Sequence, residues 1–243
     1  MDADRIKEII GDVDTSGDPH IRIIKCAPAA SRRLGIFASS FNPTTLAHVE
    51  LIHRAAKEFA LDEVLALAGK TNADKLDYQC PLEDRLMMLA LAFAADSTVS
   101  IGLSSHAFYV DMVDAVRRVS LPQADLHFIV GFDTFERLLD AEDRYTERYH
   151  RKFAGRTEAL NYLFAHSRLI VAGRAGASLS SVMHLVEQEP AVPRDRIFYL
   201  DFPADLGELS ATEARKRSRE GKPLHEIVPP AVEEYIREHH LYL

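Results

Sequence analysis

Short apolar runs alternate along this chain with segments whose apolar residues recur at helical spacing. The runs contain β-branched or aromatic residues, as strands do, and lie at Leu34–Ser39, Glu63–Ala68, Thr98–Leu103, Leu126–Gly131, Arg168–Gly173 and Ile197–Asp201. Helical spacing is clearest from Leu46 to Phe59 and from Leu82 to Phe93. Near-continuous apolar strands that alternate with amphipathic helices favour a parallel sheet covered on both faces. The sequence therefore predicts an α/β fold, a Rossmann-like doubly wound parallel sheet whose ligands bind beyond the carboxyl ends of the strands.

The composition is that of an ordinary globular protein. The 243 residues are 47% hydrophobic and 27% charged, which suffices for a sizeable core without disulfides. The two cysteines, Cys26 and Cys80, have neither zinc-site nor disulfide-framework spacing. The longest apolar stretch, Leu86 to Ala95, is too short to cross a bilayer, and the acidic start does not resemble a secretory signal. A net charge of −8 argues against duplex nucleic acid as a partner. Taken together, these features lead us to expect a cytoplasmic protein with neither a membrane nor a nucleic-acid partner.

The chain divides into an N-terminal extension, residues 1–33, that packs on the core, and a main domain, residues 34–243. Within the extension we expect a helix around Arg5–Ile10, and an edge strand is one reading of Ile21–Lys25. The apolar residues of the segment Asp140–Gly155 have no clear helical or strand periodicity. We interpret this segment as a helical insertion or as a loop over the site. These patterns leave the oligomeric state open, including a homo-oligomer.

The segment Leu34 to Ile52 has the order strand, tight turn, helix start. At a helix start, free backbone N–H groups and the positive end of the helix dipole favour phosphate. Small side chains at Ser39 and Ser40 let the backbone approach a ligand, Thr44 or Thr45 can cap the helix, and His48 lies about one turn further on. The plainer alternative is that the threonines only cap and that His48 is an ordinary polar residue of a surface helix.

A second phosphate-suited helix start follows the strand at Ile197–Asp201. Ser210 and Thr212 form a Ser-x-Thr cap, and Arg215, about one turn later, offers a planar guanidinium for bidentate binding. We expect the neighbouring charges Lys216, Arg217 and Arg219 to form a solvated face. The alternative for the whole segment is a capped surface helix.

A carboxylate at the end of a middle strand is a third candidate. Gly131 and Asp133 stand where the strand Leu126–Gly131 ends, and an acidic residue there can accept hydrogen bonds from ribose hydroxyls. Asp133 could equally be the N-cap of the helix that runs through Leu139.

Two further segments are candidates for binding an acceptor. Lys70, Asn72 and Lys75 follow the second strand and suit a phosphate, although loop lysines are commonly just solvated. Tyr109 could stack on an aromatic ring of a ligand or pack against the sheet, and packing is the more common fate.

Three of these segments resemble the HxGH nucleotidylyltransferase superfamily. The sequence SSFNPTTLAH is similar to the signature GxFxPxHxGH, with Thr45 and His48 at the two signature positions and Ala47 in place of a glycine. LSATEAR is similar to ISSTxIR, with Ala211 in place of a serine, and the segment at Gly131 resembles GxDxxxxL. Together with the C-terminal VPPAVEEYIREHHLY, these segments resemble nicotinamide and nicotinate mononucleotide adenylyltransferases.

The resemblance implies a Rossmann-like fold of the nucleotidylyltransferase type and transfer of the adenylyl group of ATP to a pyridine mononucleotide, with Mg²⁺ bound mainly through the ATP phosphates. The implied catalytic residues are His48, Thr45 and Arg215. The implied ATP-binding residues are Phe37, Ser39, Ser40, His48, Gly131, Asp133, Ser210, Thr212 and Arg215. The implied acceptor-binding residues are Phe41, Asn42, Asn72, Lys75 and Tyr109.

Other activities are weaker interpretations of the same segments. An acceptor such as phosphopantetheine, or cytidylyl transfer from CTP to a phosphorylated alcohol, keeps the superfamily but changes the substrates. A non-catalytic regulatory module that binds a nucleotide is suggested by the alanines at 47 and 211. The sequence has no GxxxxGK[ST], GxSxG or HExxH motif.

Overall fold

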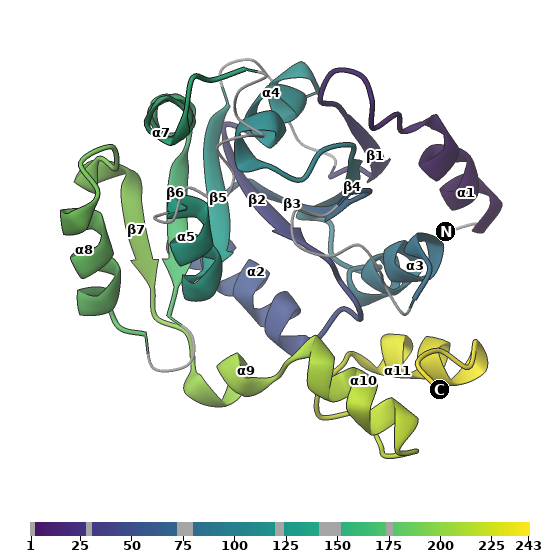
Figure 1. Ribbon diagram of the computed structural model, residues 1–243. Coiled ribbons are helices and arrows are strands. Elements are labelled where there is room, and N and C mark those ends of the chain that lie inside the picture. Colours follow the sequence, from purple (N-terminus) through teal and green to yellow (C-terminus); the bar gives the residue numbers. More distant parts are fainter. Residues whose placement is uncertain (1–2, 28–30, 72–79, 120–123, 141–151, 174–176) are drawn as a thin grey trace.

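The computed structural model describes residues 3–27, 31–71, 80–119, 124–140, 152–173 and 177–243. The described residues form a seven-stranded sheet (Figure 1). Its strands are β1 (Ile21–Lys25), β2 (Arg33–Ser39), β3 (Glu63–Gly69), β4 (Val99–Ser104), β5 (Asp125–Gly131), β6 (Arg168–Ala172) and β7 (Ile197–Leu200). The six apolar runs are therefore confirmed as strands, with boundaries that differ by one residue at most, and Ile21–Lys25 is the edge strand considered from the sequence.

The strand order β1-β4-β3-β2-β5-β6-β7 places β2 in the middle of the sheet. All pairings from β4 through to β7 are parallel, and only β1 runs antiparallel, against β4. The chain adds β3 and β4 on one side of β2 and then returns to add β5, β6 and β7 on the other. The gap between the carboxyl ends of β2 and β5 is therefore the topological switch point, where open α/β sheets bind their ligands.

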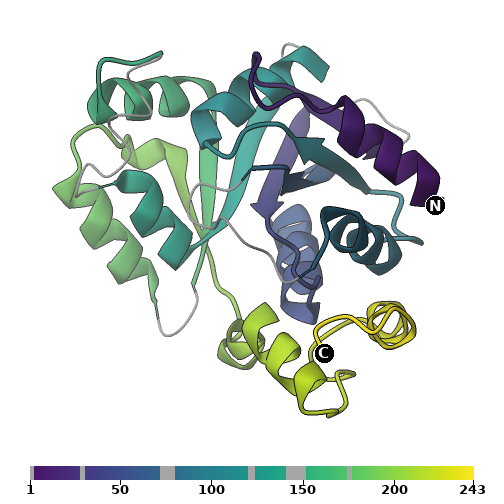
Figure 2. The ribbon, with the colours of Figure 1, turned by 45° about the vertical axis from the view of Figure 1, so that its right-hand side comes forward.

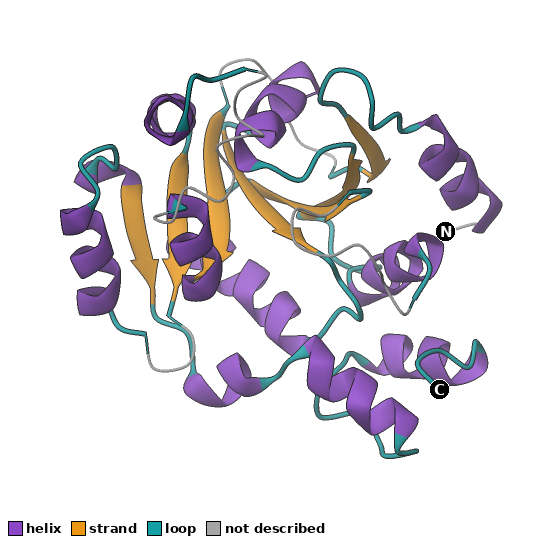
Figure 3. Cartoon of the chain, viewed as in Figure 1, coloured by secondary structure: helices purple, strands orange, loops and turns teal. Residues whose placement is uncertain are grey.

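Helices cover both faces of the sheet (Figure 3). The described α-helices are α1 (Ala3–Asp12), α2 (Leu46–Glu58), α3 (Leu82–Ala92), α4 (Tyr109–Val119), α5 (Phe132–Leu139), α7 (Arg156–His166), α8 (Leu179–Gln188), α9 (Ala204–Glu208), α10 (Ala211–Arg219) and α11 (Pro230–Glu238). Buried residues of α4, α5, α7 and α8 share one core cluster, whereas those of α1 and α2 share another with most of the buried residues of α3. The described helices include none long and apolar enough to span a membrane.

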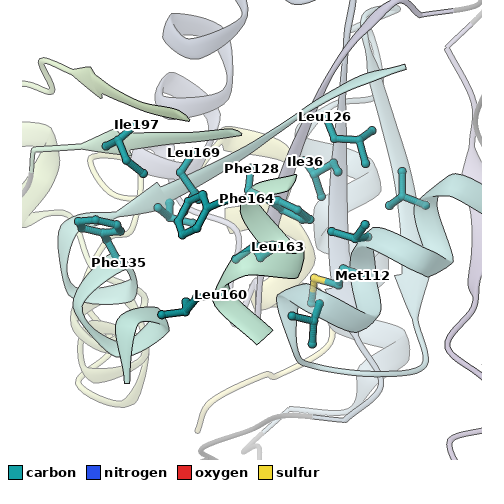
Figure 4. Close-up of a cluster of buried hydrophobic side chains, with 14 of the residues drawn as sticks. Ile36, Met112, Leu126, Phe128, Phe135, Leu160, Leu163, Phe164, Leu169 and Ile197 are labelled. Atoms are coloured by element: carbon teal, nitrogen blue, oxygen red, sulfur yellow. The ribbon is translucent and has the colours of Figure 1, made fainter. Parts of the chain in front are cut away.

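The two core clusters arise from the alternation of side chains along each strand. Ile36 and Phe128 belong to the cluster under α4, α5, α7 and α8, part of which is drawn in Figure 4. Their neighbours in sequence, Phe37 and Ile129, belong to the cluster under α1, α2 and α3. Successive side chains of a strand point to opposite faces of the sheet, so strands that are apolar at every position bury both faces.

The last two helices form a third cluster at the carboxyl edge of the sheet. Figure 1 shows α10 and α11 beyond the edge to which the arrows of β5, β6 and β7 point, and Figure 2 shows them beneath α2 and α3. Ala214 of α10 and Val232 and Ile236 of α11 are buried together with Met88 of α3 and Cys80. This packing holds the C-terminal part of the chain next to the switch point.

His127, near the start of β5, is a buried ionisable group. Its ring lies 6.4 Å from the Phe198 ring, and its Nδ1 lies 3.1 Å from the Asp125 carbonyl oxygen. Burial, together with the charge of Arg33, lowers the pKa of His127 from 6.5 to about 4. The folded protein thus holds this ring neutral at pH values where the unfolded chain takes up a proton.

We predict a loss of stability from this group as the pH falls from about 6.5 towards 4. Because the pKa of His127 is lower in the folded state, this residue contributes fully to the free energy of unfolding at pH values above its pKa in the unfolded chain. Below that pH the unfolded chain is protonated first, which lowers the free energy of unfolding by on the order of 2 kcal/mol across this window. His127→Gln should flatten that part of the curve of unfolding free energy against pH in urea titrations. His184→Gln, on an exposed position of α8, is the control, and equal pH slopes for the two variants would contradict the prediction.

Candidate active site

The loop between β2 and α2 is shaped by a capping interaction. Thr45 is the N-cap of α2, and its hydroxyl accepts a hydrogen bond from the His48 backbone N–H at 3.4 Å. In return, the Thr45 backbone N–H donates to Nδ1 of His48 at 2.9 Å. Such reciprocal pairs form a capping box, here with histidine in the third helical position. Of the two candidate threonines, Thr45 is therefore the cap, and the cap orients the His48 ring.

The same interaction determines which nitrogen of the half-buried His48 carries its proton. Nδ1 accepts from a backbone N–H, which can only donate, so the neutral ring carries its hydrogen on Nε2. Nε2 lies 3.4 Å from Oγ of Ser39, the last residue of β2. His48 is thus held as a neutral donor beside the carboxyl end of the central strand.

Two aromatic residues support the His48 ring. The Phe37 and Phe41 ring centroids lie 5.8 and 5.4 Å from that of His48, and the two phenylalanine rings meet edge to face. Both phenylalanine side chains are buried. Their rings therefore pack against His48 within the fold. Contact of Phe37 or Phe41 with a ligand stays a prediction.

Two arginines hold the loop on either side of Phe41. Phe41 has a left-handed backbone with φ of 46°, which non-glycine residues adopt at a cost of about 1–2 kcal/mol. Arg85 of α3 donates to the Ser40 carbonyl oxygen at 3.0 Å, and Arg215 of α10 donates to the Asn42 carbonyl oxygen at 2.6 Å. The carbonyl groups that flank the strained residue are thus both fixed by guanidinium groups.

Arg215 also connects the loop to the second predicted helix start. Ser210 is the N-cap of α10 and accepts from the Glu213 backbone N–H at 3.1 Å, as expected. A second nitrogen of Arg215 donates to the Thr212 hydroxyl at 3.1 Å. Because Asn42 and Arg215 are 173 residues apart in sequence, this side chain brings the two predicted phosphate-binding segments together.

The basic residues that follow Arg215 behave as the sequence predicted. Lys216 and Arg219 are exposed. Arg217 forms ion pairs with Glu213 at 3.1 Å and Glu226 at 3.2 Å. These charges belong to the outer face of α10.

One of the two readings of Asp133 is wrong. The N-cap of α5 is Gly131, because β5 runs straight into the helix, and Asp133 is the second residue of α5. Asp133 is exposed and lies just beyond the carboxyl end of β5, a strand that pairs with β2. Contact between Asp133 and a ribose stays a prediction.

Lys70 has a structural role that the sequence did not predict. Its ammonium group donates to the carbonyl oxygens of Ile10 at 2.6 Å and Val13 at 2.7 Å, at the end of α1. A cation is favoured there because the last carbonyl groups of a helix lack partners within the helix. Lys70 therefore anchors the N-terminal extension, and its contact with a phosphate stays a prediction.

The other predicted acceptor-binding residues are placed only in part. Tyr109 is the first residue of α4, and its ring meets that of Phe128 edge to face at 5.1 Å. Of the two alternatives for Tyr109, this is packing against the sheet. Burial raises the pKa of its hydroxyl.

Asn42 is buried, and its side-chain oxygen accepts a hydrogen bond from the Tyr242 hydroxyl at 2.7 Å. Asn72, Lys75 and most of Asp140–Gly155 lie outside the described residues.

Sequence reasoning missed Arg85 and Tyr242. Arg85 is buried in α3 but directly follows the acidic Glu83 and Asp84, so the local sequence resembles a solvent-exposed charged turn and gave no signal. Tyr242 is the last residue of VPPAVEEYIREHHLY, a segment that was used for the family resemblance but that gave no role to this tyrosine. Among the described residues there is no group of three histidine, cysteine, aspartate or glutamate side chains that could hold a metal ion.

Comparison with known proteins identifies the family. Residues 36–217 match the family model described as cytidylyltransferase-like. The chain belongs to this family. The match begins in β2 and ends in α10, and so includes His48, Asp133 and Arg215.

Relatives of this cytidylyltransferase-like protein carry a consistent name. It is 30% identical over 218 residues to the "Probable nicotinate-nucleotide adenylyltransferase" of Moorella thermoacetica, covering 86% of this chain and 91% of the relative. It is 30% identical to the protein of the same name from Thermus thermophilus, covering 86% and 99%. Among solved structures, nicotinic acid mononucleotide adenylyltransferase of Plasmodium falciparum complexed with NaAD matches with a TM-score of 0.64 and 16% identity, covering 87% of this chain and 97% of that one. This structural likeness supports the fold.

Adjacent threonines allow a matched test of the capping box. Thr45→Val should lower the free energy of unfolding by about 1 kcal/mol, because the cap of α2 is lost. The Thr44 hydroxyl is buried with no hydrogen-bond partner among the described residues, so Thr44→Val should leave stability unchanged or raise it by up to about 1 kcal/mol. Urea unfolding of the two variants measures the difference, and a Thr45→Val protein as stable as wild type would show that the capping box contributes nothing.

Proposed function

We propose that this chain transfers the adenylyl group of ATP to nicotinate mononucleotide, forming the deamido form of NAD and releasing pyrophosphate. The observation that carries the proposal is that Arg215 joins two helix starts at the switch point, each with hydroxyl groups or backbone N–H groups suited to phosphate. The names of the curated relatives favour nicotinate mononucleotide as the acceptor.

The reaction requires positioning and charge stabilisation. A phosphate oxygen of the mononucleotide attacks the α-phosphorus of ATP in line, a new oxygen–phosphorus bond forms, and the bond from the α-phosphorus to the bridging oxygen breaks. The electron pair of that bond leaves with pyrophosphate, so no covalent intermediate with the protein is needed. Negative charge grows on the leaving group, and groups already oriented before the reaction stabilise it most.

Two side chains, those of His48 and Arg215, have geometry suited to that charge. The Nε2–H of His48 is a donor whose direction the Thr45 backbone fixes. The guanidinium plane of Arg215 is held by Asn42 and Thr212. We propose that these groups bind the triphosphate together with Ser210 and Thr212, and that His48 and Arg215 matter most in the transition state.

The remaining parts of the site are proposed from their positions. Ser39, Ser40 and Gly131 lie at or just beyond the carboxyl ends of β2 and β5, where backbone can approach ATP, and the exposed Asp133 is suited to ribose hydroxyls. From their place in the sequence alone, Asn72 and Lys75 are the proposed contacts of the mononucleotide. Mg²⁺ carried on the ATP phosphates would offset part of their charge. Both cysteines are free thiols, which supports the proposal of a reducing, cytoplasmic location.

The direct experiment is an assay of pyrophosphate release from ATP and Mg²⁺. Nicotinate mononucleotide, nicotinamide mononucleotide and phosphopantetheine are supplied separately, and product masses are determined. We expect the deamido dinucleotide with nicotinate mononucleotide as the best substrate. Turnover with phosphopantetheine alone would replace the proposed acceptor, and ATP binding without any product would favour a regulatory module.

Replacing His48 tests its role in the transition state. His48→Ala should lower kcat about 100-fold or more while the protein remains folded, because one preorganised donor is lost. His53→Ala is the control, since His53 lies on the same helix, is exposed and contacts Asp96 at 2.7 Å. Comparable kcat values for the two variants would remove His48 from the mechanism.

Replacing Arg215 tests whether the planar guanidinium group is required. Arg215→Lys keeps the charge but cannot hold the Asn42 carbonyl and the Thr212 hydroxyl with a fixed plane, so we expect kcat/KM for ATP to fall at least about tenfold. Arg217→Lys, on the same helix but paired with Glu213 and Glu226, should stay within about twofold of wild type. Steady-state kinetics at saturating mononucleotide measure both, and equal kinetics for the two variants would contradict the assignment.

A further inference from the structure

The last residues of the chain turn back towards the first motif. After α11, His240 has a left-handed backbone with φ of 51°. The backbone N–H of Leu241 donates to the Ile236 carbonyl oxygen at 3.0 Å, and that of His240 donates to the Arg237 carbonyl oxygen at 3.4 Å. These bonds form a Schellman motif, which ends the helix and reverses the chain. Histidine occupies the position where glycine is usual.

Tyr242 is held beside the motif by several contacts. Its backbone is also left-handed, with φ of 65°, although tyrosine is unfavourable in that region. The preceding Leu241 carbonyl oxygen accepts a hydrogen bond from the Ser218 hydroxyl of α10 at 3.0 Å. The Tyr242 side chain is only 6% exposed. Non-glycine residues stay in this conformation where the surrounding structure requires it, and such places cluster at functional sites.

The Tyr242 hydroxyl completes the support of Asn42. It donates to the side-chain oxygen of Asn42 at 2.7 Å, while Arg215 donates to the backbone oxygen of the same residue at 2.6 Å. Burial raises the pKa of Tyr242, so the hydroxyl keeps its proton and remains a donor. Asn42 lies three residues before Thr45, whose backbone N–H orients His48. A displacement of Asn42 would therefore reach the His48 ring through a short, buried segment.

We propose that Tyr242 is a positioning residue for adenylyl transfer, whose hydroxyl fixes Asn42 and through it the loop that orients His48. This inference rests on the proposed function. It makes the C-terminal tail part of the architecture of the site, although the tail lies about 200 residues from the motif in sequence. Tyr242 acts through Asn42 and does not itself contact the reacting phosphates.

Tyr242→Phe removes the hydroxyl and keeps the ring. We expect kcat to fall about five- to tenfold with KM for ATP within about twofold, since the loss affects orientation in the transition state more than ground-state binding. Tyr235→Phe is the control, because its hydroxyl, on α11, donates to Asp84 of α3 at 2.8 Å and lies outside the motif. The control should keep kcat within about twofold of wild type. An unchanged kcat in folded Tyr242→Phe protein overturns the proposal.

A double-mutant cycle tests whether Tyr242 acts through Asn42. In an Asn42→Ala background, Tyr242→Phe should have no further effect on kcat, because its partner is already absent. If Tyr242→Phe lowers kcat equally in both backgrounds, the hydroxyl acts by another route and the proposal fails.

A measurement without turnover separates this inference from the proposed reaction. Amide hydrogen exchange of residues 39–46 should be faster in Tyr242→Phe than in wild type or Tyr235→Phe, because the loop loses one of its buried contacts. This result would support the contact even if the wild-type protein failed to make a dinucleotide. Equal exchange in all three proteins would overturn the proposal whatever the reaction.

Discussion

The hydrogen bond from the Arg215 guanidinium to the Asn42 carbonyl oxygen joins the two halves of the site, and much of the site's geometry depends on it. The first half stands at the start of α2 and the second at the start of α10, and the bonded residues Asn42 and Arg215 are 173 residues apart. Their helix dipoles and free N–H groups act on one ligand only if the two starts are held at a fixed separation. The bond supplies that connection next to Phe41, the residue with a left-handed backbone. The same contact thus fixes the loop and orients the cation.

In the proposed mechanism, the site relies on orientation more than on an accumulation of charge. The protein carries a net charge of −8, so any attraction for a triphosphate has to be local. Arg215 is held by two oxygen atoms and His48 by a capping box. Side chains held in this way need little reorganisation when charge develops on the leaving phosphate, which is the physical basis of electrostatic catalysis. The buried rings of Phe37 and Phe41 serve the same end by restricting the His48 ring.

The sequence predicted the parts of the fold that depend on local pattern. Apolar runs with β-branched residues marked six strands, because such runs are stable when both faces of a sheet are covered. The two helix starts were found because Thr45 and Ser210 stand directly before helical spacing begins. The N-cap reading of Asp133 failed because β5 enters α5 without a loop, which makes Gly131 the cap. Lys70 was considered for phosphate because sequence spacing cannot show that the end of α1 lies within its reach.

By itself the sequence determined the α/β class, the strands, the helix starts and the identity of the motif residues. Periodicity and capping act within a few residues, and a sequence displays them directly. Only the tertiary structure decided that Arg85, Arg215 and Tyr242 converge on residues 40–42. It also decided that the extension is anchored by Lys70. Those contacts join segments that become neighbours only after the helices pack on the sheet, so their partners are set by the fold and leave no local pattern in the chain.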